Sequence, residues 1–332
     1  MTIGPSRNDG EHRRKPVPQS FTFTSHGTAC DAWHFPAADD RLATEAGRPA
    51  VVMAHGFAGT KDCGLHSFAE QLSGIGCDVV AFDYRGFGAS AGQPRGIISP
   101  AGQIDDYRAA LTATGRLSDV DAGRLVLWGV SMSGGTVLAV AAGRTDIAAV
   151  IALTPLVSAL SRDNPEPLPA RTVTTSGKRS AAHTALLLTA AARDKYAAAR
   201  HRSRIMLPAV GRLHELALLN LAGTYDDYLA IAGPTWRNEV GAAIALDALT
   251  HRPDRFAAQL RCQALFQIAD FDRCVPVRAA TRAAVRARAR IRHYPCDHFD
   301  VYPGRRWHEC VRDHQAQFLS DVLSVSTRSV NA

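Results

Sequence analysis

The sequence predicts an α/β protein built on one mostly parallel sheet, and two observations support this class. Short, continuously apolar runs recur along the chain, as is typical of strands that are covered on both faces. Helical patterns lie between these runs, and such alternation indicates βαβ units. The apolar runs of strand length are residues 50–54, 78–82, 124–128, 148–153 and 263–268.

The remaining elements follow in chain order. Residues 1–18 are polar and lack periodicity, so we expect a disordered tail. Two alternating runs then flank His26-Gly27, which favours a hairpin. These runs are residues 21–25 and 29–35, a last strand is expected at 290–294, and helices are expected at 65–72, 101–114, 134–142, 277–289 and 307–323.

The alternation breaks between residues 156 and 254. This stretch contains the proline-rich residues 164–169, followed by helical patterns that include 181–193 and 212–221. Because the strand pattern resumes at residue 263, we interpret the stretch as an insertion. The expected organisation is an α/β core of residues 19–155 and 255–325, interrupted by a helical cap at 156–254.

Composition limits the classes of function. The chain has 332 residues, of which 46% are hydrophobic and 21% charged, which is ordinary for a globular protein. No uninterrupted apolar run reaches about 18 residues, and the N-terminus is polar, so neither a membrane span nor a secretory signal is predicted. We therefore expect a cytoplasmic protein. Its oligomeric state cannot be inferred from the sequence.

Charge and cysteine content suggest no special partner. The net charge is +7, but no nucleic-acid motif accompanies it, so a nucleic-acid partner is not predicted. The seven cysteines are scattered, odd in number and never spaced as CxxC. This pattern indicates neither a disulfide framework nor a zinc site, and no metal is expected.

The main chemical signal is the motif Gly129-Val-Ser131-Met-Ser133-Gly-Gly135 after an apolar strand. A strand, a tight turn and a small-residue helix start are the context of a nucleophile elbow. The pattern is GxSxS instead of GxSxG, so two registers are possible. Ser131 is the favoured nucleophile because Gly129 closes the strand, and Ser133 is the alternative. A serine-rich helix start without chemistry would also explain the motif taken alone.

An acid and a base follow in the order expected for such a nucleophile. Asp272 comes just after the strand at 263–268, so it lies at the carboxyl edge of the sheet. Asp270 is the alternative carboxylate. His298 follows the last strand by a few residues, and the chain order Ser, Asp, His is that of α/β-hydrolases.

A fourth segment completes the predicted site. The loop His55-Gly56-Phe57 follows the strand at 50–54. An oxyanion hole needs two backbone N–H groups directed at developing negative charge, and we expect them to come from Phe57 and Met132. His55 is expected to shape this loop and not to take part in catalysis.

Four segments together resemble the α/β-hydrolases over nearly all of residues 20–325. They are similar to bacterial hydrolases labelled dienelactone-hydrolase-like or X-Pro-peptidase-like, a group that includes relatives of fungal polyketide acyltransferases. The resemblance implies an eight-stranded sheet with helices on both faces and a helical cap after the sixth strand. The segments are HGF at 55–57, FDYRGFGAS at 82–90, WGVSMSGG at 128–135 and HFDVY at 298–302.

The sequence thus predicts a serine esterase that acts on a small acyl compound and needs no cofactor. Acyl transfer by the same triad and a non-catalytic ligand-binding role are the alternatives. Trp236 and Arg237, late in the expected cap, are candidates for the substrate pocket or for holding the cap to the core. Tyr225, Asp226, Asp227 and Tyr228 form a second polar and aromatic cluster without an assigned role.

Overall fold

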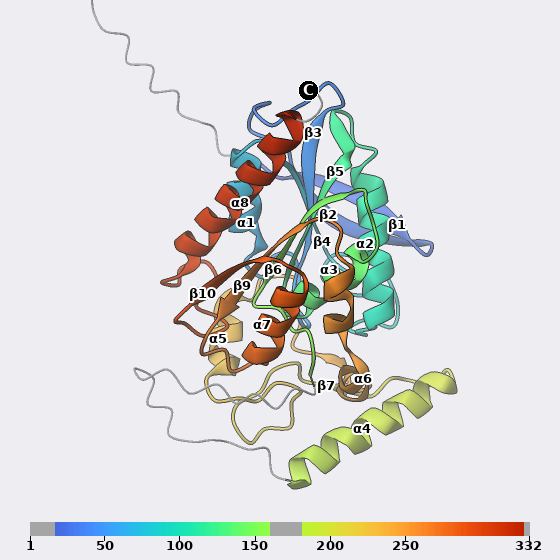
Figure 1. The fold of residues 1–332 in the computed structure, drawn as a ribbon. Helices are drawn as coiled ribbons and strands as arrows, with labels where there is room; N and C mark the ends of the chain where they lie inside the picture. The colour runs from blue at the N-terminus through green and yellow to red at the C-terminus, as the bar shows by residue number, and fades with distance from the viewer. Residues whose placement is uncertain (1–16, 160–180, 329–332) are drawn as a thin grey trace, which may run out of the picture.

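An eight-stranded sheet forms the centre of the molecule in the computed structural model, which describes residues 17–159 and 181–328 (Figure 1). Its strand order is β1-β2-β4-β3-β5-β6-β9-β10. The strands are β1 (Gln19–Ser25), β2 (Thr28–Phe35), β3 (Arg48–Ala54), β4 (Asp78–Phe82), β5 (Val120–Val130), β6 (Ile147–Leu153), β9 (Gln263–Ala269) and β10 (Arg290–Tyr294).

The strand directions confirm the expected sheet. β1 and β2 form an antiparallel hairpin, and β2 is antiparallel to β4. All other neighbouring pairs, from β4 to β10, are parallel. The central strands are buried along almost their whole length because helices cover both faces, which explains their continuously apolar sequences.

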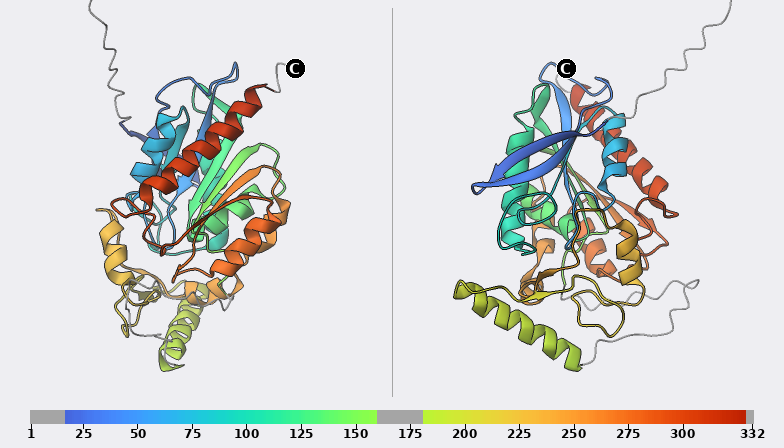
Figure 2. Two further views of the ribbon diagram at one scale, coloured as in Figure 1. Left: turned by 60° about the vertical axis from the view of Figure 1, so that its left-hand side comes forward. Right: turned by 180° about the vertical axis from the view of Figure 1, so that it is seen from behind.

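Helices pack on the two faces and define two hydrophobic clusters. On one face, α1 (Leu65–Gly74) and α8 (His308–Arg328) cover side chains such as Val51 and Trp128. On the other face, α2 (Pro100–Thr114), α3 (Met132–Ala141) and α7 (Val277–Arg286) cover Val52 and Leu127. This three-layer arrangement is visible in Figures 1 and 2.

Residues 156–254, the inserted segment, connect β6 to β9. The described part gathers at one end of the sheet in all views (Figures 1 and 2). Its elements are α4 (Ala181–Ala199), β7 (Met206–Leu207), α5 (Thr224–Ile231), β8 (Val240–Gly241), α6 (Ile244–Thr250) and the start of a 3₁₀ helix, Pro253–Gln259. The proline-rich residues 164–169 and most of the expected N-terminal tail lie outside the described residues.

One predicted helix in the inserted segment is wrong. Residues 212–221 form a loop, in which His214 has a positive φ of 77° that a helix does not contain. The loop returns on itself, so that the N–H of Leu219 donates to the carbonyl of Ala209 at 2.9 Å. Apolar residues at helical spacing here contact the core from a loop. Among the described helices, none is long and apolar enough to cross a membrane.

Candidate active site

Ser131 occupies a sharp turn between a buried strand and a helix. β5 ends at Val130 and α3 begins at Met132, so Ser131 alone makes the connection, with φ 56° and ψ −118°. This left-handed conformation is strained for a residue that has a Cβ. It is held by the N–H of Ser131, which donates to the Leu153 carbonyl at 2.8 Å.

Two glycines make room for this turn. A Cβ on Gly129 would lie 2.3 Å from the carbonyl oxygen of Ser133, so only glycine fits two residues before Ser131. A Cβ on Gly56 would lie 2.8 Å from the Cβ of Ser131. The loop after β3 therefore approaches the Ser131 side chain as closely as backbone can.

The hydroxyl of Ser133 is engaged inside the protein. It donates to the carbonyl of His55, and the Tyr84 hydroxyl lies 2.6 Å from it. Ser133 is fully buried, whereas Ser131 lines a cavity. This geometry favours Ser131 over Ser133 as the reactive serine.

Asp272 and His298 meet as the sequence pattern predicts. The Nδ1 of His298 lies 2.6 Å from Oδ2 of Asp272, and the Asp272 side chain is fully buried. Its other oxygen, Oδ1, accepts the N–H groups of Cys274 at 2.7 Å and Val275 at 2.9 Å. Asp270, the alternative acid, pairs instead with His293 at the surface, 2.6 Å away.

The surroundings of His298 favour its protonated form. Burial alone would lower the pKa of this imidazole, but the charge of Asp272 and its hydrogen bond raise it. The net effect raises the pKa of His298 above its ordinary value of 6.5. With Nδ1–H committed to Asp272, Nε2 is the atom left for proton transfer.

Asp297 is a site residue that sequence reasoning did not assign. Its Oδ1 accepts the backbone N–H of His298 at 2.7 Å and that of Arg273 at 3.1 Å. Its Oδ2 lies 2.9 Å from Nε of Arg273. Burial raises the pKa of Asp297, although the Arg273 charge opposes this. The sequence signal that could have identified this pair is its position, because Asp297 directly precedes His298 and Arg273 directly follows Asp272.

The two predicted oxyanion donors border the same cavity. Phe57 and Met132 line it together with Ser131 and His298. The Met132 N–H belongs to the first turn of α3, where helix amides have no intrahelical acceptor. Within residues 17–159 and 181–328, neither the Phe57 nor the Met132 N–H is hydrogen-bonded to a protein acceptor.

His55 supports the loop that carries Phe57. Its Nδ1 lies 2.9 Å from the Gly56 carbonyl, and its ring packs edge-on against Tyr84 at 5.0 Å. Burial lowers the pKa of His55, which keeps the imidazole neutral. Both observations fit the expected role in shaping the loop.

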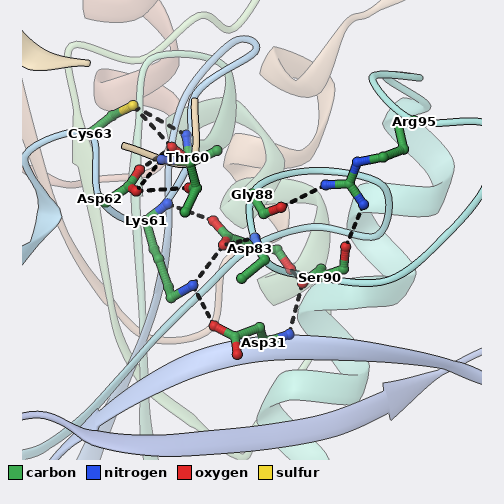
Figure 3. A network of polar contacts seen from close by, with 11 residues as sticks. Asp31, Thr60, Lys61, Asp62, Cys63, Asp83, Gly88, Ser90 and Arg95 are labelled. Carbon is green, nitrogen blue, oxygen red and sulfur yellow. Dashed lines mark hydrogen bonds and ion pairs between the residues drawn. The ribbon is translucent and has the colours of Figure 1, made fainter. Parts of the chain in front are cut away.

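A buried ion-pair network anchors the other end of this loop (Figure 3). Nζ of Lys61 lies 2.7 Å from Asp83 and 2.5 Å from Asp31, and Lys61 is only 3% exposed. Asp83 also accepts the Lys61 N–H at 2.6 Å and the Ala89 N–H at 3.0 Å. The network joins β2, the loop after β3 and the loop after β4.

We expect Lys61→Met to reduce the free energy of unfolding by about 3–5 kcal/mol, because it leaves the fully buried Asp83 carboxylate without its cation. Urea unfolding would measure the loss. Lys195→Met is the matched control, since the Lys195–Asp247 pair is half-exposed and should contribute at most about 1 kcal/mol. Equal losses in both variants would contradict a structural role for the buried pair.

One cavity of about 360 Å³ contains the predicted serine and histidine. Its walls come from the core loops and from the inserted segment, and the lining residues that the structure describes include no Asp, Glu, Lys or Arg. Most lining residues are apolar. Those from the inserted segment include Leu156, Leu218, Leu219, Tyr228, Ile231, Ile244 and Leu249.

The described residues that line this cavity do not include Trp236 or Arg237, which the sequence offered either for the substrate pocket or for holding the cap to the core. Trp236 lies behind Tyr228, with ring centroids 5.1 Å apart, and its Nε1 donates to the Ala58 carbonyl at 3.0 Å. Trp236 thus contacts the core loop, the other possibility raised by the sequence. Arg237 is exposed and borders a separate, smaller hollow.

Among the described residues, three side chains of the types that bind metal ions lie close together at this site. Ligand atoms of Asp272, Cys274 and His298 all lie within 4.8 Å of one another. Asp272 and His298 are already hydrogen-bonded, so a cation bound by all three would compete with that bond. Burial raises the pKa of Cys274 well above 9, which disfavours the thiolate that metals bind.

Comparisons with known proteins place this geometry in context. A family model described as Serine aminopeptidase, S33, matches residues 45–208. The quorum-quenching protein AidA of Acinetobacter baumannii is 32% identical over 312 residues, which cover 93% of this chain and 96% of the relative. The polyketide transferase grgF of a Penicillium species is 34% identical over 43% of this chain and 46% of its own length. The crystal structure of alpha/beta hydrolase GrgF from Penicillium sp. sh18 has the same fold, with a TM-score of 0.74 at 23% identity, covering 93% of this chain and 99% of that one.

Proposed function

Because this chain belongs to the α/β-hydrolase family, we propose that it is a serine hydrolase that cleaves a carboxylic ester or a related acyl compound. One observation carries the proposal. A serine on a strained elbow and a buried Asp–His pair open onto the same apolar cavity. The proposed triad is Ser131, Asp272 and His298.

The proposed reaction proceeds through an acyl-enzyme. Nε2 of His298 removes the proton from Ser131 as Oγ attacks the carbonyl carbon, and the C=O electron pair moves onto oxygen. Asp272 orients His298 and stabilises its cation. The N–H groups of Phe57 and Met132 bind the oxyanion. When the oxyanion collapses, the leaving group departs with the proton from His298, which then activates water to release the acyl group.

The cavity wall supports an uncharged, apolar acyl group. Within the described parts of the wall, no side chain is acidic or strongly basic, so a charged group on the acyl chain would be desolvated there without a partner. The inserted segment supplies much of this wall and, in the proposal, acts as the cap that selects the acyl chain. The leaving group is not specified by these contacts.

An ester panel tests this substrate class. Each buried methylene contributes about 0.8 kcal/mol, so we expect kcat/KM for p-nitrophenyl octanoate to exceed that for the acetate by at least about tenfold. A half-ester with a terminal carboxylate, of the same length as the octanoate, serves as the matched control and should be a poor substrate. Equal rates for all three esters would contradict binding of the acyl chain in the cavity. The absence of any hydrolysis would contradict the proposal that the protein is an esterase.

Acyl transfer is the second candidate, because one relative is named a polyketide transferase. The same triad would serve, and only the acceptor that attacks the acyl-enzyme would differ. Product analysis with an added alcohol or amine separates the two. A transferred acyl product that dominates over the free acid in water favours transfer, and free acid alone favours hydrolysis.

A further inference from the structure

In the sequence Tyr225-Asp226-Asp227-Tyr228 on α5, Asp226 is exposed, Tyr225 is half-buried, and the other two residues are buried. Tyr225 lies beneath the Arg212 guanidinium, 4.6 Å from its ring centroid, and Asp226 pairs with Arg212 at 3.1 Å. Asp227 and Tyr228 are buried. One helical turn thus contains two Tyr and two Asp residues, and the second of each type is the more buried one.

Tyr228 contacts the loop that carries the proposed oxyanion donor. Its hydroxyl donates to the Phe57 carbonyl at 2.6 Å, and its ring lines the Ser131 cavity. The next carbonyl, that of Ala58, accepts from Trp236 at 3.0 Å. Ala58 has a positive φ of 54°, a strained conformation that needs such fixed contacts. Two side chains of the inserted segment therefore fix the backbone just after the Phe57 N–H.

Asp227 contacts the other half of the site. Its Oδ2 pairs with Nη2 of Arg273, and its Oδ1 accepts from Arg305 at 3.1 Å. Arg273 also pairs with Asp297 at 2.9 Å, and Asp297 accepts the backbone N–H of His298. Asp227 is thus linked through Arg273 to the loops that hold Asp272 and His298.

We propose that α5 aligns the two halves of the active site, with Tyr228 as a positioning residue for the oxyanion loop and Asp227 as one for the acid and histidine loops. This inference rests on the proposed function, since it assigns the Phe57 N–H to the oxyanion. Because Tyr228 also lines the acyl cavity, the residue that contacts the acyl chain is the one that fixes the oxyanion donor. Binding of the chain and stabilisation of the transition state thereby share one side chain.

Tyr228→Phe removes only the hydroxyl and keeps the ring on the cavity wall. We expect kcat for the best ester to fall by about tenfold, less than the 10²–10³ typical of losing an oxyanion donor itself. KM should stay within about twofold, because the ring that contacts the acyl chain remains. The affinity of an alkyl trifluoromethyl ketone, which forms an oxyanion on the serine, should fall in parallel with kcat.

Tyr225→Phe is the matched control on the same helix and should leave kcat, KM and ketone affinity unchanged. Asp227→Asn should lower kcat at least about fivefold, whereas Asp226→Asn should not. Equal behaviour of inner and outer variants would overturn the inference. If Tyr228→Phe or Asp227→Asn changes kcat and KM together and also lowers Tm, the role of that residue is purely structural and the inference is overturned.

The two proposals fail in different ways. If wild-type protein reacts with a fluorophosphonate and hydrolyses esters but Tyr228→Phe matches it in kcat, only the inference about α5 is wrong. If folded wild-type protein does neither, the serine-hydrolase proposal is wrong, and the role of α5 in aligning the site falls with it.

Discussion

Ser131→Ala is expected to lower kcat/KM for the best ester by at least about 10⁴-fold and to abolish labelling by a fluorophosphonate probe. The variant lacks the only atom that can form the proposed acyl-enzyme. Ser131 is the residue on the strained elbow and lines the cavity with His298. The variant should remain folded, since alanine fits the space of serine and the hydrogen bonds at this position come from the backbone.

Ser133→Ala is the matched control, because it removes the hydroxyl of the alternative register two residues away. We expect it to be labelled at a rate close to wild type. Its free energy of unfolding should fall by about 1–3 kcal/mol, because the buried hydroxyl of Tyr84 loses a hydrogen-bond partner. Loss of labelling only in Ser133→Ala would show that the nucleophile is Ser133. Labelling that persists in both variants would place the reactive group elsewhere.

The sequence predicted the parts of this site that depend on local pattern. Ser131 was found because a strand, a turn and a helix start adjoin in the chain. Asp272 and His298 were found because parallel strands place the loops that follow them at one edge of the sheet. Their pairing was expected from the chain order Ser, Asp, His, and their side chains are in contact in the structure although they lie 26 residues apart.

Contacts made by the inserted segment could not be predicted in this way. Tyr228 and Phe57 are 171 residues apart, and no repeating pattern relates them. Only the last two residues of the cluster at 225–228 are buried, and their helix of eight residues is too short for a clear period. Residues 212–221 have helical spacing but form a loop, since tertiary contacts outweigh weak local propensity.

The positions of Trp236 and Arg237 also could not be predicted from the sequence. The sequence left two roles open for this pair, lining the pocket or holding the cap to the core; Trp236 donates to the loop after β3, and Arg237 is exposed. The residues that do line the cavity from the inserted segment are mostly leucines and isoleucines. In sequence these cannot be distinguished from ordinary core residues, because an apolar acyl pocket and a core require the same side chains.

Asp272→Asn is expected to lower kcat by about 10⁴-fold while the fold is retained. The asparagine carbonyl oxygen can still accept the N–H groups of Cys274 and Val275, as Oδ1 does now. Its NH₂ group then faces Nδ1 of His298. Because two donors cannot pair, His298 must carry its proton on Nε2, where it can no longer accept one from Ser131.

The pH profile of the residual activity tests the electrostatic part of this argument. His298 acts as a base only when neutral, so wild-type kcat/KM should rise with pH through a pKa above 6.5. In Asp272→Asn the raising effect of the carboxylate is lost and burial lowers the pKa, although Asp297 still opposes this and Arg273 adds to it. The acid limb of the profile should therefore move to lower pH.

Asp270→Asn is the control for both measurements, because Asp270 pairs with His293 at the surface and has no contact with His298 among the described residues. Its kcat should stay within about twofold of wild type and its acid limb should not move. The opposite result, with Asp270→Asn inactive and Asp272→Asn active, would exchange the two acids. The substitution Asp272→Asn removes the negative charge nearest to the His298 imidazole, so the pKa of His298 must change. If the acid limb stays in place in a nearly inactive Asp272→Asn, the group that titrates in the profile is not His298.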